Sequence, residues 1–188
     1  MDSTPVECGR SRQTTQRSAL AGWAEHGYSA SHTRFFWGPR LHLLRTLSGL
    51  PPAFAITGAN ADERLTLLDM LDTDPDPLMR HRHQTALADM HYYDRDVETA
   101  LAERDLALLR KTRKGEPQTP EHPCSNHYAR PSSRSTRPSR ANSTCHGART
   151  ATGVIARVIV PILALTAVIW HNDHTNQPVK RSLIAYDH

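Results

Sequence analysis

Two aspartates are the side chains in this chain best suited to metal-dependent chemistry. Asp89 follows a short apolar run in ALADMHYY, and Asp2 opens the chain in MDSTPV. Mg²⁺ prefers carboxylate oxygens that are held rigidly, and two such ions roughly 4 Å apart can clamp both oxygens of a phosphoryl transfer. An aspartate at a strand end is more commonly a turn or helix cap, and chain termini are often poorly ordered. Spacing alone therefore leaves both interpretations open.

Histidines form two further clusters, for which we favour the simpler interpretation. His171, Asp173 and His174 lie together in HNDHT, and His81 and His83 lie together in RHRH. Neither cluster has a further ligand at a convincing spacing for a transition metal. We predict a solvated helix end and a surface loop. The sequence contains no Ser/His/Asp motif, nucleotide-binding glycine loop or zinc-finger spacing.

The elements that would carry these aspartates begin with a predicted hairpin. Residues 34–47 alternate, with Leu41 and Leu43 on one side and His42 and Leu44 on the other. A turn at Ser48-Gly49 leads to a second strand over 53–57. Residues 1–33 are polar and irregular, and we expect a loop or insertion there.

A helix, a strand, a helix and a strand are predicted next. Asp62 can cap a helix in which Leu65, Leu68 and Leu71 recur at helical spacing, and Pro75 and Pro77 follow it. We then expect a short strand within 85–94, a helix from Val97 with Ala100 and Leu101 facing inward, and a strand over 106–111. This order is typical of an α/β fold with a mixed sheet.

The pattern stops after Lys114. Residues 122–145 contain no Leu, Ile, Val, Phe, Met or Trp, and we expect disorder over about 115–146. Residues 122–145 hold four of the 23 basic residues, Arg130, Arg134, Arg137 and Arg140, and no acidic residue; the rest of the chain has 19 basic and 19 acidic residues. Helical texture resumes over 147–188. We expect 154–170, with Arg157 and Pro161, to be a core helix rather than a membrane span.

Cysteine usage and the N-terminus favour a reducing compartment. Cys8, Cys124 and Cys145 show no CxxC spacing, and their odd number argues against a disulfide framework. The N-terminal residues contain no apolar run after a basic start, so we predict no secretory signal.

Several segments together resemble a known family. DSTPVECGRSR, AGWAEHGYSASHTRFFWGPRLHLL, LSGLPPAFAITGANADERLTLLDML, ADMHYYDRD and ILALTAVIWHNDHT with RSLIAYDH look like bacterial insertion-sequence transposases with a DDE catalytic domain. The resemblance implies an RNase H-like fold with flanking helices, here incomplete. It assigns 1–114 to the first part of that domain and 147–188 to its C-terminal helical part.

The resemblance also implies a site of three carboxylates that holds Mg²⁺ or Mn²⁺ to cut and join DNA. Carried over, the first falls on Asp2 and the second on Asp89, where Met90 replaces the family's usual lysine. The chain begins at this first aspartate, so we expect its leading strand to be missing. The third, a glutamate in a motif like PLRxxIESINxTFKGQLDLE, should lie between Lys114 and His146 and is absent; Glu116 and Glu121 are poor substitutes.

A change of reading frame accounts for the missing glutamate. One permitted choice of codons for residues 126–145, read from the third base of the Asn126 codon, encodes PLRPAIESINQTFKGQLDL. Its glutamate codon straddles Ser132 and Ser133. We therefore interpret 115–146 as an out-of-frame segment and expect this copy to be truncated and inactive.

Two other classes of function stay open. The chain could be a basic nucleic-acid-binding protein with Arg130–Arg140 as a disordered arm, or a single-pass membrane protein through 154–170. For the favoured class, we expect DNA as partner, a homo-oligomer on DNA, no membrane, and a bacterial cytoplasmic location at the nucleoid.

Overall fold

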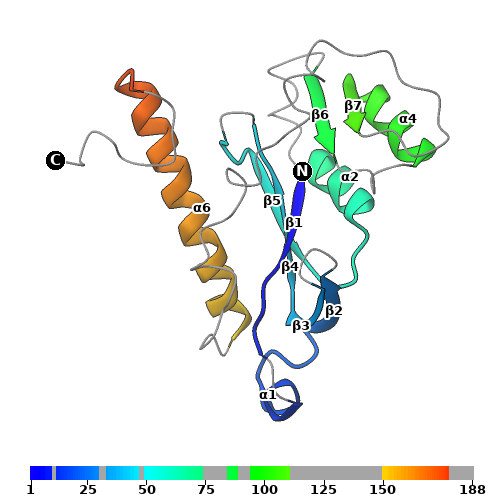
Figure 1. Cartoon of the computed structure of the whole chain (residues 1–188), viewed down its shortest axis with the longest axis vertical. Coiled ribbons are helices and arrows are strands. Elements are labelled where there is room, and N and C mark those ends of the chain that lie inside the picture. Colours follow the sequence, from blue (N-terminus) through cyan, green and yellow to red (C-terminus); the bar gives the residue numbers. More distant parts are fainter. Residues whose placement is uncertain are drawn as a thin grey trace.

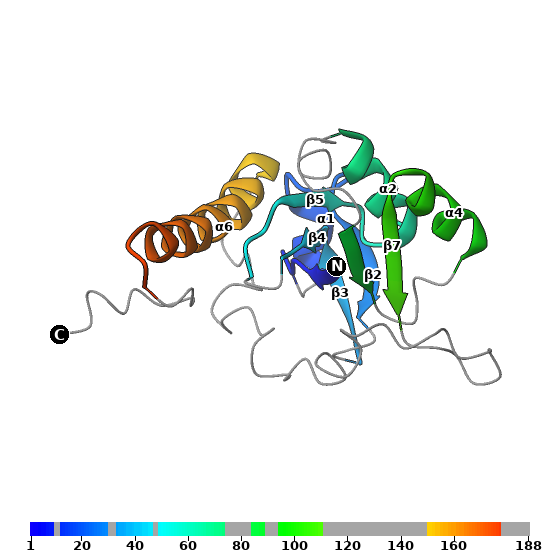
Figure 2. The same cartoon turned by 90° about the horizontal axis from the view of Figure 1, so that it is seen from above.

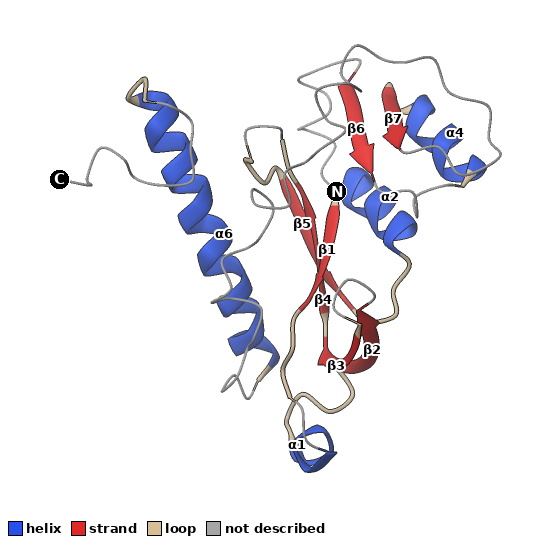
Figure 3. Cartoon of the chain, in the orientation of Figure 1, coloured by secondary structure: helices blue, strands red, loops and turns tan. Residues whose placement is uncertain are grey.

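The chain folds into small sheets with helices on both sides. The structure is a computed structural model that describes residues 1–9, 12–29, 33–46, 49–73, 84–88, 94–110 and 150–177. Its elements are β1 (Asp2–Pro5), α1 (Arg12–Arg17), β2 (Glu25–Ser29), β3 (Arg34–Gly38), β4 (Arg40–Leu44), β5 (Ala53–Thr57), α2 (Glu63–Thr73), β6 (Gln84–Ala88), α4 (Arg95–Glu103), β7 (Leu106–Arg110) and α6 (Ala151–His174) (Figures 1 and 3). The prediction of a mixed α/β protein is confirmed.

The described strands form three sheets rather than one. β1, β4 and β5 form an antiparallel sheet in the order β1–β4–β5, β2 pairs with β3 antiparallel, and β6 pairs with β7 in parallel. The predicted hairpin is present as β4–β5. Its first strand is shorter than expected, because the predicted strand over 34–47 divides at Gly38 and Pro39 between two sheets.

Gly38 shows why that strand divides. Its φ is +154°, and a Cβ at this position would lie 2.0 Å from the carbonyl oxygen of Val6. The segment after β1 crosses the chain here, with the Val6 amide donating to the Pro39 carbonyl and the Cys8 amide to the Trp37 carbonyl, both at 2.9 Å. A glycine followed by a proline thus separates β3 from β4.

The expectation of a loop over residues 1–33 was wrong for most of its described part. β1, α1 and β2 lie there, and Leu20 is 1% exposed. β1 is held by pairing with β4, whose residues are distant in sequence, and β2 is held by pairing with β3, the next strand along the chain. Local patterns predict such short strands poorly, because their stability comes from neighbours across the sheet.

Helices cover the two faces of the β1–β4–β5 sheet (Figures 1 and 2). On one face, Leu41 and Ile56 pack with Val154 and Val158 of α6. On the other, Leu44 packs against a cluster shared by α2, α4 and β7, whose buried members are Leu67, Leu71, Val97, Leu101 and Leu106. The alternation of Leu41 and Leu44 between faces confirms the predicted period.

The helices in the middle of the chain begin and end close to where the sequence predicts. Asp62 caps α2, because its Oδ1 accepts from the Arg64 amide at 2.8 Å. Asp94 caps α4 in the same way through the Asp96 amide at 2.9 Å. The buried stripe of α2 differs from the prediction, since Leu65 is 60% exposed and Thr66, Leu67, Met70 and Leu71 are buried.

The long helix α6 packs on one side only. Its buried residues are Val154, Val158, Ile169 and Asn172, while Val160, Leu163 and Trp170 are 60 to 63% exposed. It is long and apolar enough to cross a membrane by length and composition, which is weak evidence for a single helix. The prediction of a core helix therefore holds for one face alone. Pro161 lies inside the helix.

Candidate active site

The structure places the first predicted site residue at the start of β1. Asp2 is paired with Leu43 of β4. Asp89 follows β6 directly and lies outside the described residues. Glu116, Glu121, His81 and His83 lie outside them as well, as does the segment 115–146 on which the expectation of disorder falls.

Although Asp2 and Asp89 are far apart in sequence, the elements next to them are close in space. Met1 packs against the buried cluster of α2, α4 and β7, and Leu108 of β7 packs against the same cluster. β7 pairs with β6 in parallel, with Ala88 at the end of β6 opposite Arg110. Figures 1 and 2 both show the N-terminus beside the end of β6. The start of β1, where Asp2 lies, and the end of β6 therefore belong to one region of the molecule.

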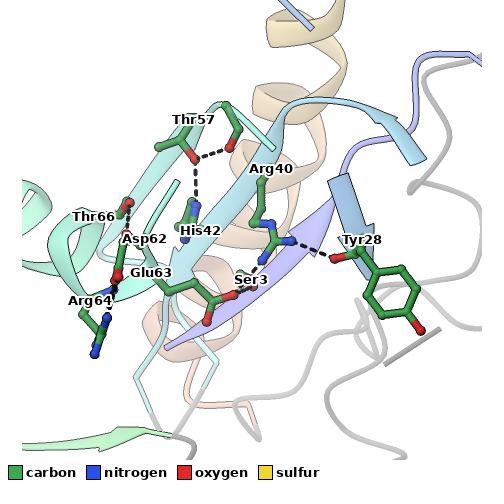
Figure 4. Close-up of polar contacts among 10 residues, drawn as sticks. Ser3, Tyr28, Arg40, His42, Thr57, Asp62, Glu63, Arg64 and Thr66 are labelled. Carbon is green, nitrogen blue, oxygen red and sulfur yellow. Dashed lines mark hydrogen bonds and ion pairs between the residues drawn. The ribbon is translucent and has the colours of Figure 1, made fainter. Parts of the chain in front are cut away.

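A polar network fixes β1 beside that region (Figure 4). The Ser3 hydroxyl donates to Oε1 of Glu63, at the start of α2. Arg40 of β4 donates from Nη1 to the same oxygen at 2.9 Å and from Nη2 to the Tyr28 carbonyl at 3.1 Å. Glu63 thus joins β1, β4 and α2, and it holds Ser3, the residue next to Asp2, by a hydrogen bond.

His42 lies beside this network and is fully buried. Its Nε2 lies 2.8 Å from the Thr57 hydroxyl, and its Nδ1 has no hydrogen-bond partner among the described residues. Burial lowers the pKa of His42 below 6.5; the Glu63 carboxylate opposes this shift, and the Arg40 guanidinium adds to it. His42 is therefore neutral near pH 7 and acts as a structural hydrogen-bonding group.

Sequence reasoning missed this network. Ser3, Arg40, His42, Thr57 and Glu63 belong to β1, β4, β5 and α2, so no local motif joins them. The one available signal was His42, a polar residue in an alternating strand whose neighbours Leu41 and Leu43 face the other way. A histidine that shares a strand face with an apolar residue such as Leu44 needs a hydrogen-bond partner when that face is buried.

The cluster of His171, Asp173 and His174, for which we predicted a solvated helix end, forms no metal site in the part of the chain described here. His171, Asp173 and His174 occupy the last turn of α6, and the ring of His174 stacks on Trp170 with centroids 5.2 Å apart. Among the described residues, no group of three His, Cys, Asp or Glu side chains could hold a metal ion.

Comparison with known families identifies the chain. Residues 1–149 match the family described as the transposase DDE domain, which is most of the 188 residues. The chain belongs to this family, as the resemblance implied. Comparisons with curated proteins and with solved structures gave no match.

Proposed function

We propose that this chain is a DNA transposase of the DDE class in which Asp2 and Asp89 are two of the three catalytic carboxylates, and that this copy is inactive because the third is missing. The family match supports the class. The observation that carries the assignment of the site is the position of β1, whose first residue is Asp2, beside the end of β6, which Asp89 follows (Figures 1 and 2).

The same arrangement supports an RNase H-like core. β1 forms one edge of its sheet, and β6 is paired with β7 alone among the described strands. Placing β6 against the free edge of β1 would give one mixed sheet in the order β5–β4–β1–β6–β7. Asp2 and Asp89 would then belong to neighbouring strands, within reach of a common ion.

Two aspartates suit a hard cation such as Mg²⁺ or Mn²⁺, because both ions prefer carboxylate oxygens. Asp2 and Asp89 would hold this ion, which would supply activation of a water or 3′-hydroxyl and stabilisation of the charge on phosphorus. The protein's part is to hold the carboxylates still. Glu63 does so for β1 through Ser3 and Arg40. With two carboxylates instead of three, the chain has too little negative charge to hold two ions firmly.

The partners and the location follow from the class. The substrate is DNA, comprising transposon ends and target, and the protein acts as a homo-oligomer on DNA in the bacterial cytoplasm at the nucleoid, without a membrane. In this proposal α6 does not cross a membrane and instead covers the sheet through Val154 and Val158.

The proposal is tested by restoring the third carboxylate. Residues 126–145 are replaced by PLRPAIESINQTFKGQLDL, and Mn²⁺ binding is followed by electron paramagnetic resonance. We expect about tenfold tighter binding or more, because affinity follows the number of charged ligands. The matched control carries glutamine in place of the restored glutamate and should bind as weakly as the unaltered chain. Asp89→Asn in the restored chain should abolish the gain.

Two results would overturn the proposal. One is Mg²⁺-dependent joining of transposon ends by the unaltered chain. The other is equal Mn²⁺ affinity for the glutamate and glutamine versions of the restored segment.

A further inference from the structure

The two-stranded sheet β2–β3 carries aromatic side chains on a solvent-facing surface. Tyr28 and Phe35 are cross-strand partners, with ring centroids 5.0 Å apart and planes inclined by 58°. Phe35 is 80% exposed and Tyr28 is 46% exposed. His26, two residues before Tyr28, is exposed on the same face of the sheet. Adjacent exposed rings of this kind make the surface a candidate binding site.

This aromatic platform, formed by His26, Tyr28 and Phe35, borders a cavity. The cavity has a volume of about 650 Å³ and is lined by Glu7, Gly9, Thr15, His26, Arg34, Phe35, Phe36 and Trp37. Such a volume accommodates a flat group of the size of a nucleobase. The lining combines aromatic faces with hydroxyl, imidazole and guanidinium groups that can bond to the edge of a base.

Arg40 of β4 contacts the strands that carry the platform. Arg40 of β4 donates to the Tyr28 carbonyl at 3.1 Å, and its guanidinium lies 5.9 Å from the centre of the Phe36 ring. Phe36 and Trp37 are 3 and 4% exposed. The exposed rings of Tyr28 and Phe35 therefore lie on a strand pair that also carries the buried rings of Phe36 and Trp37.

The charge around the platform suits a polyanion. Arg34 borders the cavity and keeps a side chain 40% exposed while it pairs with Glu7 at 3.3 Å. α1 supplies the Thr15 wall, ends in Arg17, and contains no acidic residue. Glu7, the acid in the cavity lining, is itself buried and bound to Arg34.

We infer that the β2–β3 platform binds an unpaired base of DNA, which stacks on Phe35 and Tyr28 while Arg34 faces a neighbouring phosphate. Aromatic rings accept any base, because every base has a π-face, and nearby arginines hold the backbone. The choice of DNA as ligand rests on the proposed function. The platform lies away from Asp2, toward α1 at the other end of β1 (Figure 1), so it is distinct from the carboxylate site.

The test measures the affinity of the full chain for a fluorescein-labelled single-stranded oligonucleotide and for a blunt duplex of the same sequence, by fluorescence anisotropy. Phe35→Ala should weaken single-strand binding about tenfold and leave duplex binding unchanged, because stacking needs an unpaired base. Phe35→Leu should weaken it as much, whereas Phe35→Trp should retain full affinity. Phosphate contacts from Arg130–Arg140 act on both probes and do not produce this difference.

Trp170→Ala is the matched control. Trp170 is also a largely exposed aromatic residue, at 63%, but it lies on α6 away from the platform. Its loss should leave single-strand binding unchanged. Far-UV circular dichroism of each variant checks that the fold is kept, and Phe35 is exposed enough for its truncation to be tolerated.

Three outcomes would overturn the inference: no single-strand binding by the unaltered chain, equal losses for Phe35→Ala and Trp170→Ala, or retention of affinity in Phe35→Leu. A change of oligomeric state in Phe35→Ala, seen by sedimentation, would also overturn it by assigning the platform to a second copy of the chain. Failure of the carboxylate restoration with a positive result here would reject the proposed function and leave the platform as a DNA site.

Discussion

Replacing Glu63 should destabilise the protein more than the loss of an ordinary surface acid. Its carboxylate accepts from Ser3 and from Arg40, at 2.9 Å in the second case, and the two charged side chains are 29 and 17% exposed. A hydrogen bond to a charged group is worth about 1.5 to 3 kcal/mol when enclosed, and an acid in the first turn of a helix adds about 0.5 kcal/mol. Partial exposure reduces the first value. We expect Glu63→Ala to lower the free energy of unfolding by about 2 to 3 kcal/mol.

The measurement is urea denaturation at pH 7 followed by circular dichroism at 222 nm. Asp96→Ala is the matched control, because Asp96 is an exposed acid in the first turn of α4. Its loss should cost no more than about 0.5 kcal/mol. A double-mutant cycle of Glu63→Gln with Arg40→Met should return a coupling of about 1 to 2 kcal/mol. Equal costs for Glu63→Ala and Asp96→Ala, or a coupling near zero, would refute the claim that Glu63 holds α2 to the sheet through Arg40.

Three further changes have defined outcomes. His42 has a pKa lowered by burial, so the unfolded chain takes up its proton below pH 6.5 while the folded chain does not; stability should fall as the pH drops below 6.5, and denaturation at pH 7.5 and 5.5 should show a smaller fall in His42→Gln. Asp62→Ala should lower the free energy of unfolding by about 1 kcal/mol, because it removes the cap of α2. Asp62→Asn should retain most of the stability, because asparagine can also cap a helix, and urea midpoints measure both effects. Pro161→Ala should raise the melting temperature. An interior proline loses a helix hydrogen bond and its ring clashes with the preceding turn, which together cost up to about 3 kcal/mol. A lower melting temperature would contradict this prediction.

Elements with a strong local pattern could be predicted from the sequence. α4 is an example, since Val97 and Leu101 recur at helical spacing after Asp94, and both are buried in the structure. β4 and β5 follow from an alternating run, a turn and a second apolar run. In each case neighbours in sequence supply the signal, so one stretch of chain is sufficient to find the element.

Elements that depend on distant partners could not be predicted. β1 is four residues long and is held by β4 and by Ser3 bonding to Glu63, sixty positions further on. β3 and β4 have one continuous alternating sequence, and the crossing of the chain at Val6 separates them. The stripe of α2 was misplaced because Leu65 and Leu67 are equally apolar, and the position of α4 decides which is buried.

The candidate site divides in the same way. The resemblance to a family was sufficient to choose Asp2 and Asp89, and the family match confirms the class on which that choice depends. The polar network around Glu63 and the aromatic platform on β2–β3 were visible only when the strands were paired. Tyr28 and Phe35 lie seven residues apart, and nothing local shows that they face each other.

The most direct test of the central claim, a DDE transposase whose third carboxylate lies in another reading frame, is to sequence the coding DNA from codon 110 to codon 150. A glutamate straddling Ser132 and Ser133 requires TCG for the first serine and AGT or AGC for the second. We predict these codons, and an IESIN motif when translation starts at the third base of the Asn126 codon. A Ser132 codon that does not end in G, or a Ser133 codon that begins with TC, would contradict it.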